Sequence, residues 1–269
     1  MISNREMIKA IFFDIDGTLV PFATPGIPAE VNDAIARVRA NGVKVFIATG
    51  RHLGWIDNLG DTEFDGYVTV NGSMCLLADK KTCIHKHCIS KEDVRAITDF
   101  AHTSPIPIVA IPADGDIFIN RIDDSVRHVC GLLRVKHIDV RDLEAIDGRD
   151  VVQMMAFGTE QERNESGIFG KILKECEPTS WNPYFCDIIP DGSDKSVGID
   201  RMLEHFGIPL EDTMAFGDGN NDIGMLKHVA TGVAMGNAGE DVKAIADYIT
   251  TDVSNHGVIN AFRHFGLLK

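Results

Sequence analysis

The feature that most constrains the fold of this chain is a short apolar run that ends in acid. Residues 8–13, IKAIFF, have the composition of a strand buried on both faces, as in parallel sheets covered by helices. The next residues, 14–18, read DIDGT. Since side chains two apart in an extended chain point the same way, we expect the carboxylates of Asp14 and Asp16 to project together from the strand end. Two such carboxylates repel each other unless a cation lies between them, so the pair favours a hard divalent ion such as Mg²⁺.

Two further residues of this segment suit the binding of an anion. Gly17 lets the backbone turn sharply, and Thr18 offers a hydroxyl group and an N–H group. Both residue types are also common in ordinary turns, so a strand end with solvated acids is the alternative interpretation of the segment alone. The later chain decides between the two.

A second strand is predicted to end beside the first. Apolar residues at helical spacing within 28–40 predict an amphipathic helix, and the run 43–48 predicts a strand that is followed by Thr49 and Gly50. Strand, helix and strand in this order form a βαβ unit, whose parallel strands end at the same edge, so Thr49 is expected near Asp14. A hydroxyl and exposed N–H groups at a strand-to-helix turn suit a phosphate, while a helix N-cap at Thr49 is the alternative.

Two other segments place polar residues after predicted strands. A third strand, 66–70, is followed by Asn71 and Gly72, although Asn-Gly is also the strongest hairpin signal and a purely structural turn is the alternative. Lys195 begins a helix predicted by the apolar spacing within 197–206. Because the helix dipole disfavours a cation at this end, a nearby anion would explain Lys195, and a solvated lysine is the alternative.

The last of these strands, 213–216, leads into a glycine-rich loop, GDGNND at 217–222. The loop is not a dinucleotide-binding turn, because the third glycine position of that motif holds Asp222 and acids would repel a pyrophosphate. Asp218 and Asp222 suit a metal instead. Ligands of open α/β sheets bind outside the carboxyl ends of the strands, so all of these polar segments are expected to converge at one edge.

The pattern changes from about residue 82. Strand-like and helix-like stretches there predict an α+β insert with hairpins. We therefore expect an α/β core with a doubly wound, Rossmann-like parallel sheet over 1–80 and 188–269, and an inserted domain over 81–187. The cluster CIHKHC at 83–88 invites a zinc interpretation, but its spacing fits no closed zinc site and its alternation favours a strand.

Composition limits the partners of the chain. Its 269 residues are 44% hydrophobic and 25% charged, as in soluble globular proteins, and its net charge of −14 makes nucleic acids and anionic membranes unlikely partners. No apolar run approaches membrane-spanning length. The six cysteines are dispersed and the polar segment 1–6 does not resemble a signal peptide, so reduced thiols in the cytoplasm are expected.

These motifs, in this order, resemble those of the haloacid dehalogenase superfamily of phosphotransferases, and the resemblance covers the whole chain. The matching segments are Asp14-Ile15-Asp16-Gly17-Thr18, Thr49-Gly50-Arg51, Lys195 and Gly217-Asp218-Gly219-Asn220-Asn221-Asp222. The insert, together with Asn71-Gly72, resembles the Cof-type subfamily of phosphatases, which carry a large α/β cap domain.

The resemblance implies Mg²⁺-dependent hydrolysis of small phosphate monoesters, with sugar phosphates expected, through an aspartyl-phosphate. Asp14 would be the nucleophile and Asp16 the general acid and base. Mg²⁺ would be held by Asp14, the backbone carbonyl of Asp16, and Asp218, with Asp222 binding directly or through water. The residues expected to bind the phosphate or the rest of the substrate are Thr18, Thr49, Gly50, Asn71, Lys195 and Asn221.

Two other functions remain open on the sequence. A phosphomutase would use the same acids but would keep the phosphoryl group away from water, and a catalytically idle binding or regulatory protein would keep only the fold. The expected partner is a small phosphorylated metabolite, and the expected state is a monomer or a weak homo-oligomer.

Overall fold

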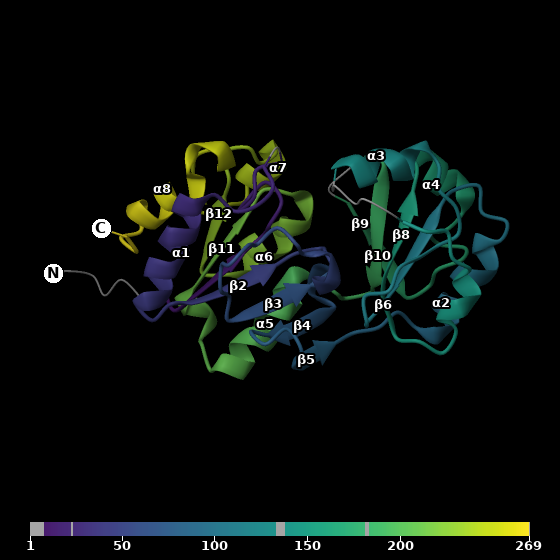
Figure 1. Ribbon diagram of the computed structural model, residues 1–269, viewed down its shortest axis with the longest axis horizontal. Coiled ribbons are helices and arrows are strands. Elements are labelled where there is room, and N and C mark those ends of the chain that lie inside the picture. Colours follow the sequence, from purple (N-terminus) through teal and green to yellow (C-terminus); the bar gives the residue numbers. More distant parts are fainter. Residues whose placement is uncertain (1–7, 23, 133–137, 181–182, 269) are drawn as a thin grey trace. The chain divides into compact units, whose positions relative to one another are not determined.

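The protein is described by a computed structural model over residues 8–22, 24–132, 138–180 and 183–268. The segment 1–6, on which the expectation of no signal peptide rests, lies outside these residues. The chain divides into two compact units, Met1–His85 with Asp194–Lys269, and Lys86–Ser193 (Figure 1). Within the described ranges, no helix is long and apolar enough to cross a membrane.

The first unit, hereafter the core, is built on one sheet with the strand order β13-β12-β11-β1-β2-β3-β4-β5. Strands from β13 to β3 are parallel to their neighbours, and β3 and β4 form an antiparallel hairpin. The strands are β1 (Ala10–Phe13), β2 (Lys44–Ala48), β3 (Gly66–Thr69), β4 (Met74–Leu77), β5 (Cys83–Lys86), β11 (Thr213–Gly217), β12 (Thr231–Ala234) and β13 (Tyr248–Ile249). The helices are α1 (Ala29–Ala40), α5 (Lys195–Phe206), α6 (Ile223–His228), α7 (Glu240–Lys243) and α8 (Gly257–His264).

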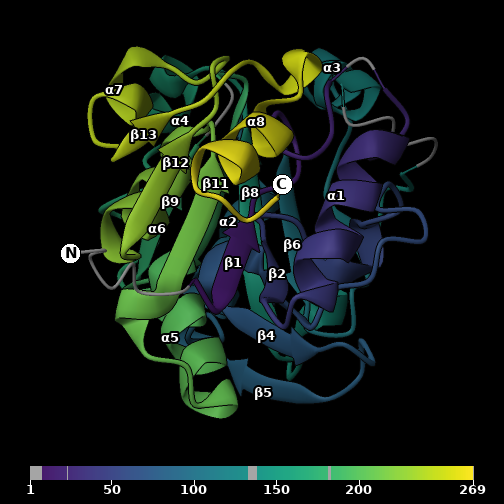
Figure 2. The same cartoon turned by 90° about the vertical axis from the view of Figure 1, so that its left-hand side faces the viewer.

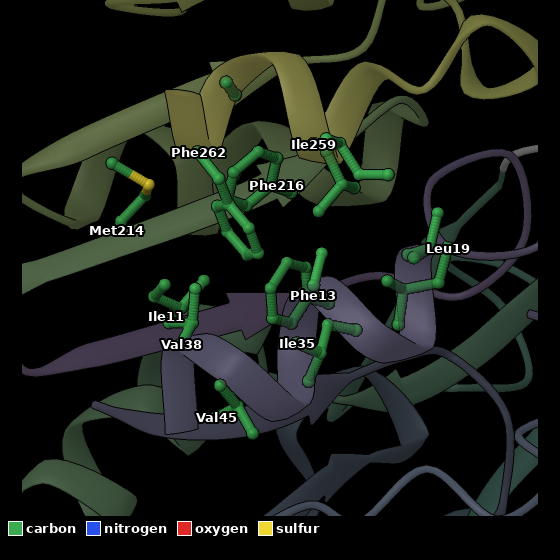
Figure 3. Packing of buried hydrophobic residues seen from close by; sticks show 14 of the residues in the cluster. Ile11, Phe13, Leu19, Ile35, Val38, Val45, Met214, Phe216, Ile259 and Phe262 are labelled. Carbon is green, nitrogen blue, oxygen red and sulfur yellow. The ribbon is translucent and has the colours of Figure 1, made fainter. Parts of the chain in front are cut away.

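The central strand β1 buries side chains on both faces of this sheet, as the apolar run predicts. Ile11 and Phe13 belong to the hydrophobic cluster beneath α1 and α8, which lie side by side in Figure 2. Ala10 and Phe12, with the opposite parity, belong to the cluster formed with α5 and α6. Figure 3 shows Phe13 among residues of α1, β11 and α8. The doubly wound α/β core is therefore confirmed.

The second unit, hereafter the cap, has its own sheet and its own hydrophobic cluster. Its antiparallel sheet has the strand order β7-β6-β8-β10-β9, and its cluster includes Ile97, Ile108 and Met154. The strands are β6 (Ile108–Pro112), β7 (Phe118–Ile119), β8 (Val151–Phe157), β9 (Cys176–Thr179) and β10 (Phe185–Pro190), and the helices are α2 (Lys91–Ala101), α3 (Asp124–Leu132) and α4 (Glu160–Ser166). The inserted α+β domain is thus present.

The chain passes from one unit to the other at 85/86 and at 193/194, a few residues later than the expected boundaries of 80/81 and 187/188. The first difference arises because β5, which contains the first four residues of the 83–88 cluster, joins the core sheet beside β4. The second arises because β10 runs to Pro190 and pairs there with Cys176 of the cap sheet. Strand pairing, which depends on distant partners, decides both boundaries.

Candidate active site

Three neighbouring parallel strands end side by side and deliver the polar segments to one edge of the core sheet. Phe13 of β1 pairs with Phe216 of β11 and with Ile47 of β2. Asp14, which follows β1, donates its N–H to the carbonyl of Phe216 at 3.0 Å. Because the three strands are in register, the residues that follow them start at the same edge, as the βαβ pattern predicts.

The cation of this edge is Lys195, the first residue of α5. Its side chain has no exposed surface, and its Nζ donates to Oδ1 of Asp14 at 2.7 Å and to Oδ1 of Asp222 at 2.6 Å. A solvated lysine, the alternative allowed by the sequence, is therefore wrong. The anion that explains a cation at this helix end is supplied by the protein itself.

Three acids surround this lysine. Oxygen atoms of Asp14, Asp218 and Asp222 lie within 4.8 Å of one another, and this is the one group suited to a metal among the residues that the structure describes. The cysteines and histidines of 83–88 therefore form no such group in the described chain. Mg²⁺ prefers oxygen ligands, and carboxylates supply both oxygens and negative charge, so the group fits a hard divalent cation.

Each acid of the group is oriented by the chain around it. The hydroxyl of Thr18 donates to Oδ1 of Asp218 at 2.8 Å. Oδ2 of Asp222 accepts the N–H groups of Asp218 and Gly219, both at 2.9 Å. Gly17 has φ +87°, and a Cβ there would lie 2.2 Å from Oδ2 of Asp218, so only glycine lets the two loops come this close.

The crowding of acids shows in their pKa values. Burial, followed by the charges of Asp222 and Asp16, raises the pKa of Asp14 to about 7 against the opposing effect of Lys195. Burial, followed by the charges of Asp14 and Asp222, raises the pKa of Asp218 to about 8. Burial alone would lower the pKa of Lys195, but the two carboxylates that it contacts outweigh burial and raise it. A bound cation would relieve this repulsion.

The carboxylate of Asp16 is not one of the three in this group, although its charge still acts on Asp14. The prediction assumed an extended chain through residue 16, whereas β1 ends at Phe13 and a turn comes next, in which Val20 donates its N–H to the carbonyl of Ile15 at 2.8 Å. Both oxygens of Asp16 instead accept from Arg51, from Nε and from Nη2, each at 2.7 Å. After this turn the two aspartates have different partners: Asp16 contacts Arg51, and Asp14 contacts Lys195.

The segment after β2 also differs from the expectation. It forms a short 3₁₀ turn, Leu53–Trp55, whose N-cap is His52, so neither a strand-to-helix turn nor an N-cap at Thr49 occurs. Thr49 is buried, and its Oγ1 accepts the N–H of Arg51 at 3.2 Å. Thr49 therefore lies in the loop that follows β2, before the 3₁₀ turn begins.

Asn71 lies in the hairpin turn that the Asn-Gly pair predicts, and its side chain also contacts another strand-end loop. It lies in the turn of the β3–β4 hairpin with φ 49°, and its side chain is buried. Its Oδ1 accepts Nδ2 of Asn221 at 3.1 Å, and its N–H donates to the carbonyl of Thr49 at 3.1 Å. A Cβ at Gly50 would lie 3.0 Å from the same Oδ1. The loops after β2, β3 and β11 are thus joined around Asn71.

Two residues of this region are not predicted from the sequence. The sequence names Arg51 only within the segment Thr49-Gly50-Arg51 and predicts no role for it. Asn237, in the loop after β12, donates from Nδ2 to the carbonyl of Gly17 at 2.8 Å and to Oδ2 of Asp218 at 3.3 Å. The position of Asn237 after another parallel strand is the signal that could have indicated it.

Comparison with known proteins identifies the family. The family model for haloacid dehalogenase-like hydrolases matches residues 11–262. The chain belongs to this family. YkrA of Bacillus subtilis (strain 168), which is named as a phosphatase, is 30% identical to this hydrolase over 262 residues, covering 97% of this chain and 99% of YkrA.

Two further relatives of this haloacid dehalogenase-like hydrolase are informative. The 5-amino-6-(5-phospho-D-ribitylamino)uracil phosphatase YcsE of the same B. subtilis strain is 29% identical over 266 residues, covering 97% of this chain and 96% of YcsE. The solved structure of the subclass IIB sugar phosphatase BT4131 has a TM-score of 0.88 at 41% identity, covering 97% of this chain and all of that one. The predicted family, its cap-bearing fold and its class of enzyme, a phosphatase, are therefore confirmed.

Proposed function

We propose that this hydrolase removes phosphate from small phosphate monoesters, with sugar phosphates as substrates, through Mg²⁺ and a covalent phosphate on Asp14. The observation that carries the proposal is the buried contact of Lys195 with Asp14 inside a group of three acids. This arrangement holds a carboxylate beside a cation at the edge of the sheet where ligands of such folds bind. The substrate class is supported by the names of BT4131, a sugar phosphatase, and YcsE, a phosphoribitylaminouracil phosphatase.

Mg²⁺ would be held by Asp14, Asp218 and the backbone carbonyl of Asp16. When bound, it would offset the repulsion between a carboxylate nucleophile and a phosphate dianion. Asp222 already uses Oδ1 for Lys195 and Oδ2 for two backbone N–H groups, so we assign it to orienting the loop and the lysine. Thr18, whose hydroxyl donates to Asp218, is assigned to orienting that ligand rather than to binding phosphate.

The covalent steps use two acids in turn. A carboxylate oxygen of Asp14 attacks phosphorus, the bond to the ester oxygen breaks, and Asp16 gives that oxygen a proton. Asp16 then takes a proton from the water that attacks the aspartyl-phosphate, which releases inorganic phosphate and restores Asp14. Each cycle consumes one ester and one water and yields one alcohol and one phosphate.

The remaining residues are assigned to the phosphoryl oxygens and to the substrate. Lys195 carries three N–H donors, two of which go to acids, and the third is assigned to a phosphoryl oxygen. Thr49, whose hydroxyl oxygen accepts from the backbone, is assigned to donate its O–H to the same group, with the N–H at Gly50. Asn71 and Asn221 are assigned to the rest of the substrate. Such donors matter most where charge develops in the transition state.

The test is a single-turnover rapid-quench experiment with a ³²P-labelled phosphate ester. Wild-type enzyme should acquire an acid-stable, hydroxylamine-sensitive label that maps to Asp14, and the Asp14→Asn variant should acquire none. Asp33→Asn, which changes an exposed acid on α1, is the matched control and should label normally. Label on another residue would contradict the proposed nucleophile.

The fate of the label separates the alternative functions. A phosphatase releases it as inorganic phosphate, a phosphomutase returns it to a second hydroxyl of the sugar, and an idle protein acquires none. A panel of phosphorylated sugars then tests the substrate class. The cytoplasmic location and the monomeric or weakly oligomeric state stay predictions from the sequence.

A further inference from the structure

The strongest unassigned feature of the core is the two-point contact between Arg51 and Asp16. Nε and Nη2 of Arg51 donate to Oδ2 and Oδ1 of Asp16, both at 2.7 Å. Both side chains are largely buried, with 16% of Arg51 and 22% of Asp16 exposed. Parallel bonds of this kind fix the plane of a carboxylate as well as its position, which a single bond does not.

Arg51 is itself anchored on the protein. Its third donor, Nη1, reaches the carbonyl of Trp55 at 3.4 Å. Its backbone carbonyl accepts the N–H of Val70 at 3.1 Å, and its own N–H donates to Oγ1 of Thr49 at 3.2 Å. The guanidinium group therefore spans Asp16 and the turn after β2, and a substrate phosphate would have to displace Asp16 to bind the Nε–Nη2 edge of Arg51. This geometry favours a role toward Asp16 over a direct role toward phosphate.

The contact leaves Asp16 able to exchange a proton. A carboxylate offers about four lone-pair positions, and the fork of Arg51 occupies two of them. The other two stay in the plane that Arg51 fixes. Since the turn after Phe13 carries Asp16 away from the Lys195 contact of Asp14, an external group must set the direction of its carboxylate, and Arg51 is the group that contacts it.

We infer that Arg51 is the positioning residue for the general acid and base, holding the Asp16 carboxylate at the angle from which it serves the leaving oxygen. The inference rests on the proposed function, because it needs Asp16 to transfer that proton. Lysine retains the charge but has no planar fork, so Arg51→Lys separates orientation from charge.

The test compares two esters of similar shape whose leaving groups differ in their need for a proton. 4-Nitrophenyl phosphate loses a stable anion, whereas phenyl phosphate loses a phenolate whose conjugate acid has a pKa of about 10, close to that of tyrosine. Single-turnover labelling of the enzyme isolates the step in which the leaving group departs. We expect Arg51→Lys to slow labelling from phenyl phosphate by about 10- to 100-fold, and labelling from 4-nitrophenyl phosphate by less than about 3-fold.

Two comparisons make the result specific. In the Asp16→Asn background, adding Arg51→Lys should cost less than about 3-fold with either ester, because the group that Arg51 orients is no longer an acid. Arg39→Lys is the matched control, since Arg39 contacts Asp65 through Nε and Nη2 at 3.3 and 3.5 Å elsewhere in the core, and it should leave the ratio of the two rates unchanged.

Different outcomes identify which proposal fails. Equal slowing of both esters by Arg51→Lys, or full slowing in the Asp16→Asn background, would show that Arg51 acts on the phosphate or on the fold and would overturn the inference. If Asp16→Asn alone slows both esters equally, the acid assignment itself is wrong. Arg51→Gln, which keeps a single NH₂ group and has no charge, repeats the comparison if the melting temperature of Arg51→Lys falls below that of the Arg39→Lys control.

Discussion

Replacing Lys195 by methionine should strongly destabilise the metal-free protein. The side chain is fully buried and makes charge-assisted bonds of 2.7 and 2.6 Å to Asp14 and Asp222. Removing one partner of a buried ion pair costs about 3–5 kcal/mol, because the remaining charge stays buried without compensation. Methionine keeps most of the aliphatic volume, so little of this loss comes from a cavity. At about 2–4 °C per kcal/mol for a chain of this size, the melting temperature should fall by roughly 6–20 °C.

The assay is differential scanning calorimetry with chelator at pH 8 and at pH 5. Lys195 opposes the rise in the pKa of Asp14, so Asp14 without this cation binds a proton more readily, and the folded variant then holds more protons at pH 5 than the folded wild type does. Stability is lost as pH rises where the folded state binds more protons than the unfolded state, so the destabilisation should be larger at pH 8. Added Mg²⁺ should restore part of the stability at pH 8.

Lys44→Met is the matched control for this experiment. Lys44 contacts Asp65 at 2.9 Å, but 46% of its side chain is exposed, so its loss should cost less than about 1 kcal/mol. Equal losses for Lys195→Met and Lys44→Met, or a loss for Lys195→Met that is the same at both pH values, would refute the assignment of Lys195 as the buried counter-ion of the acids.

The same site supports three further predictions. In chelator, the melting temperature of the wild type should fall as pH rises from 4 to 8, because the raised pKa values of Asp14 and Asp218, about 7 and about 8, favour their protonated forms in the folded state; excess Mg²⁺ should reduce this fall, and a flat profile would contradict the acid cluster. Gly17→Ala should lower kcat about 100-fold, because the added Cβ displaces the carboxylate of Asp218. Gly42→Ala is the control, since Gly42 has a similar φ of +91° but a Cβ there would meet no atom within 4 Å. It should cost only about 1 kcal/mol of stability, and kcat and the melting temperature of both variants are measured. Chelator should abolish turnover and Mg²⁺ restore it, with Ca²⁺ a poor substitute, and full activity after exhaustive chelation would exclude a metal.

The sequence by itself determines which strands form and which polar residues come directly after each strand. The apolar run 8–13 predicts a strand buried on both faces, and the order of strand and helix predicts a parallel sheet whose strand ends share one edge. These signals are local, because hydrophobic periodicity and the handedness of βαβ units need no knowledge of distant contacts. They are sufficient to bring Asp14 and Asp218 to the same edge.

Only the tertiary structure decides which side chains touch. Lys195 and Asp14 are 181 positions apart, and their contact depends on how α5 packs against the sheet. Asp16 turns to Arg51 rather than joining the acid group, because the direction of a side chain beyond a strand end depends on the backbone angles of a tight turn, which the alternation of a strand does not predict. The raised pKa of Asp14 likewise depends first on burial, a property that the fold creates and that no spacing of acids in the sequence determines.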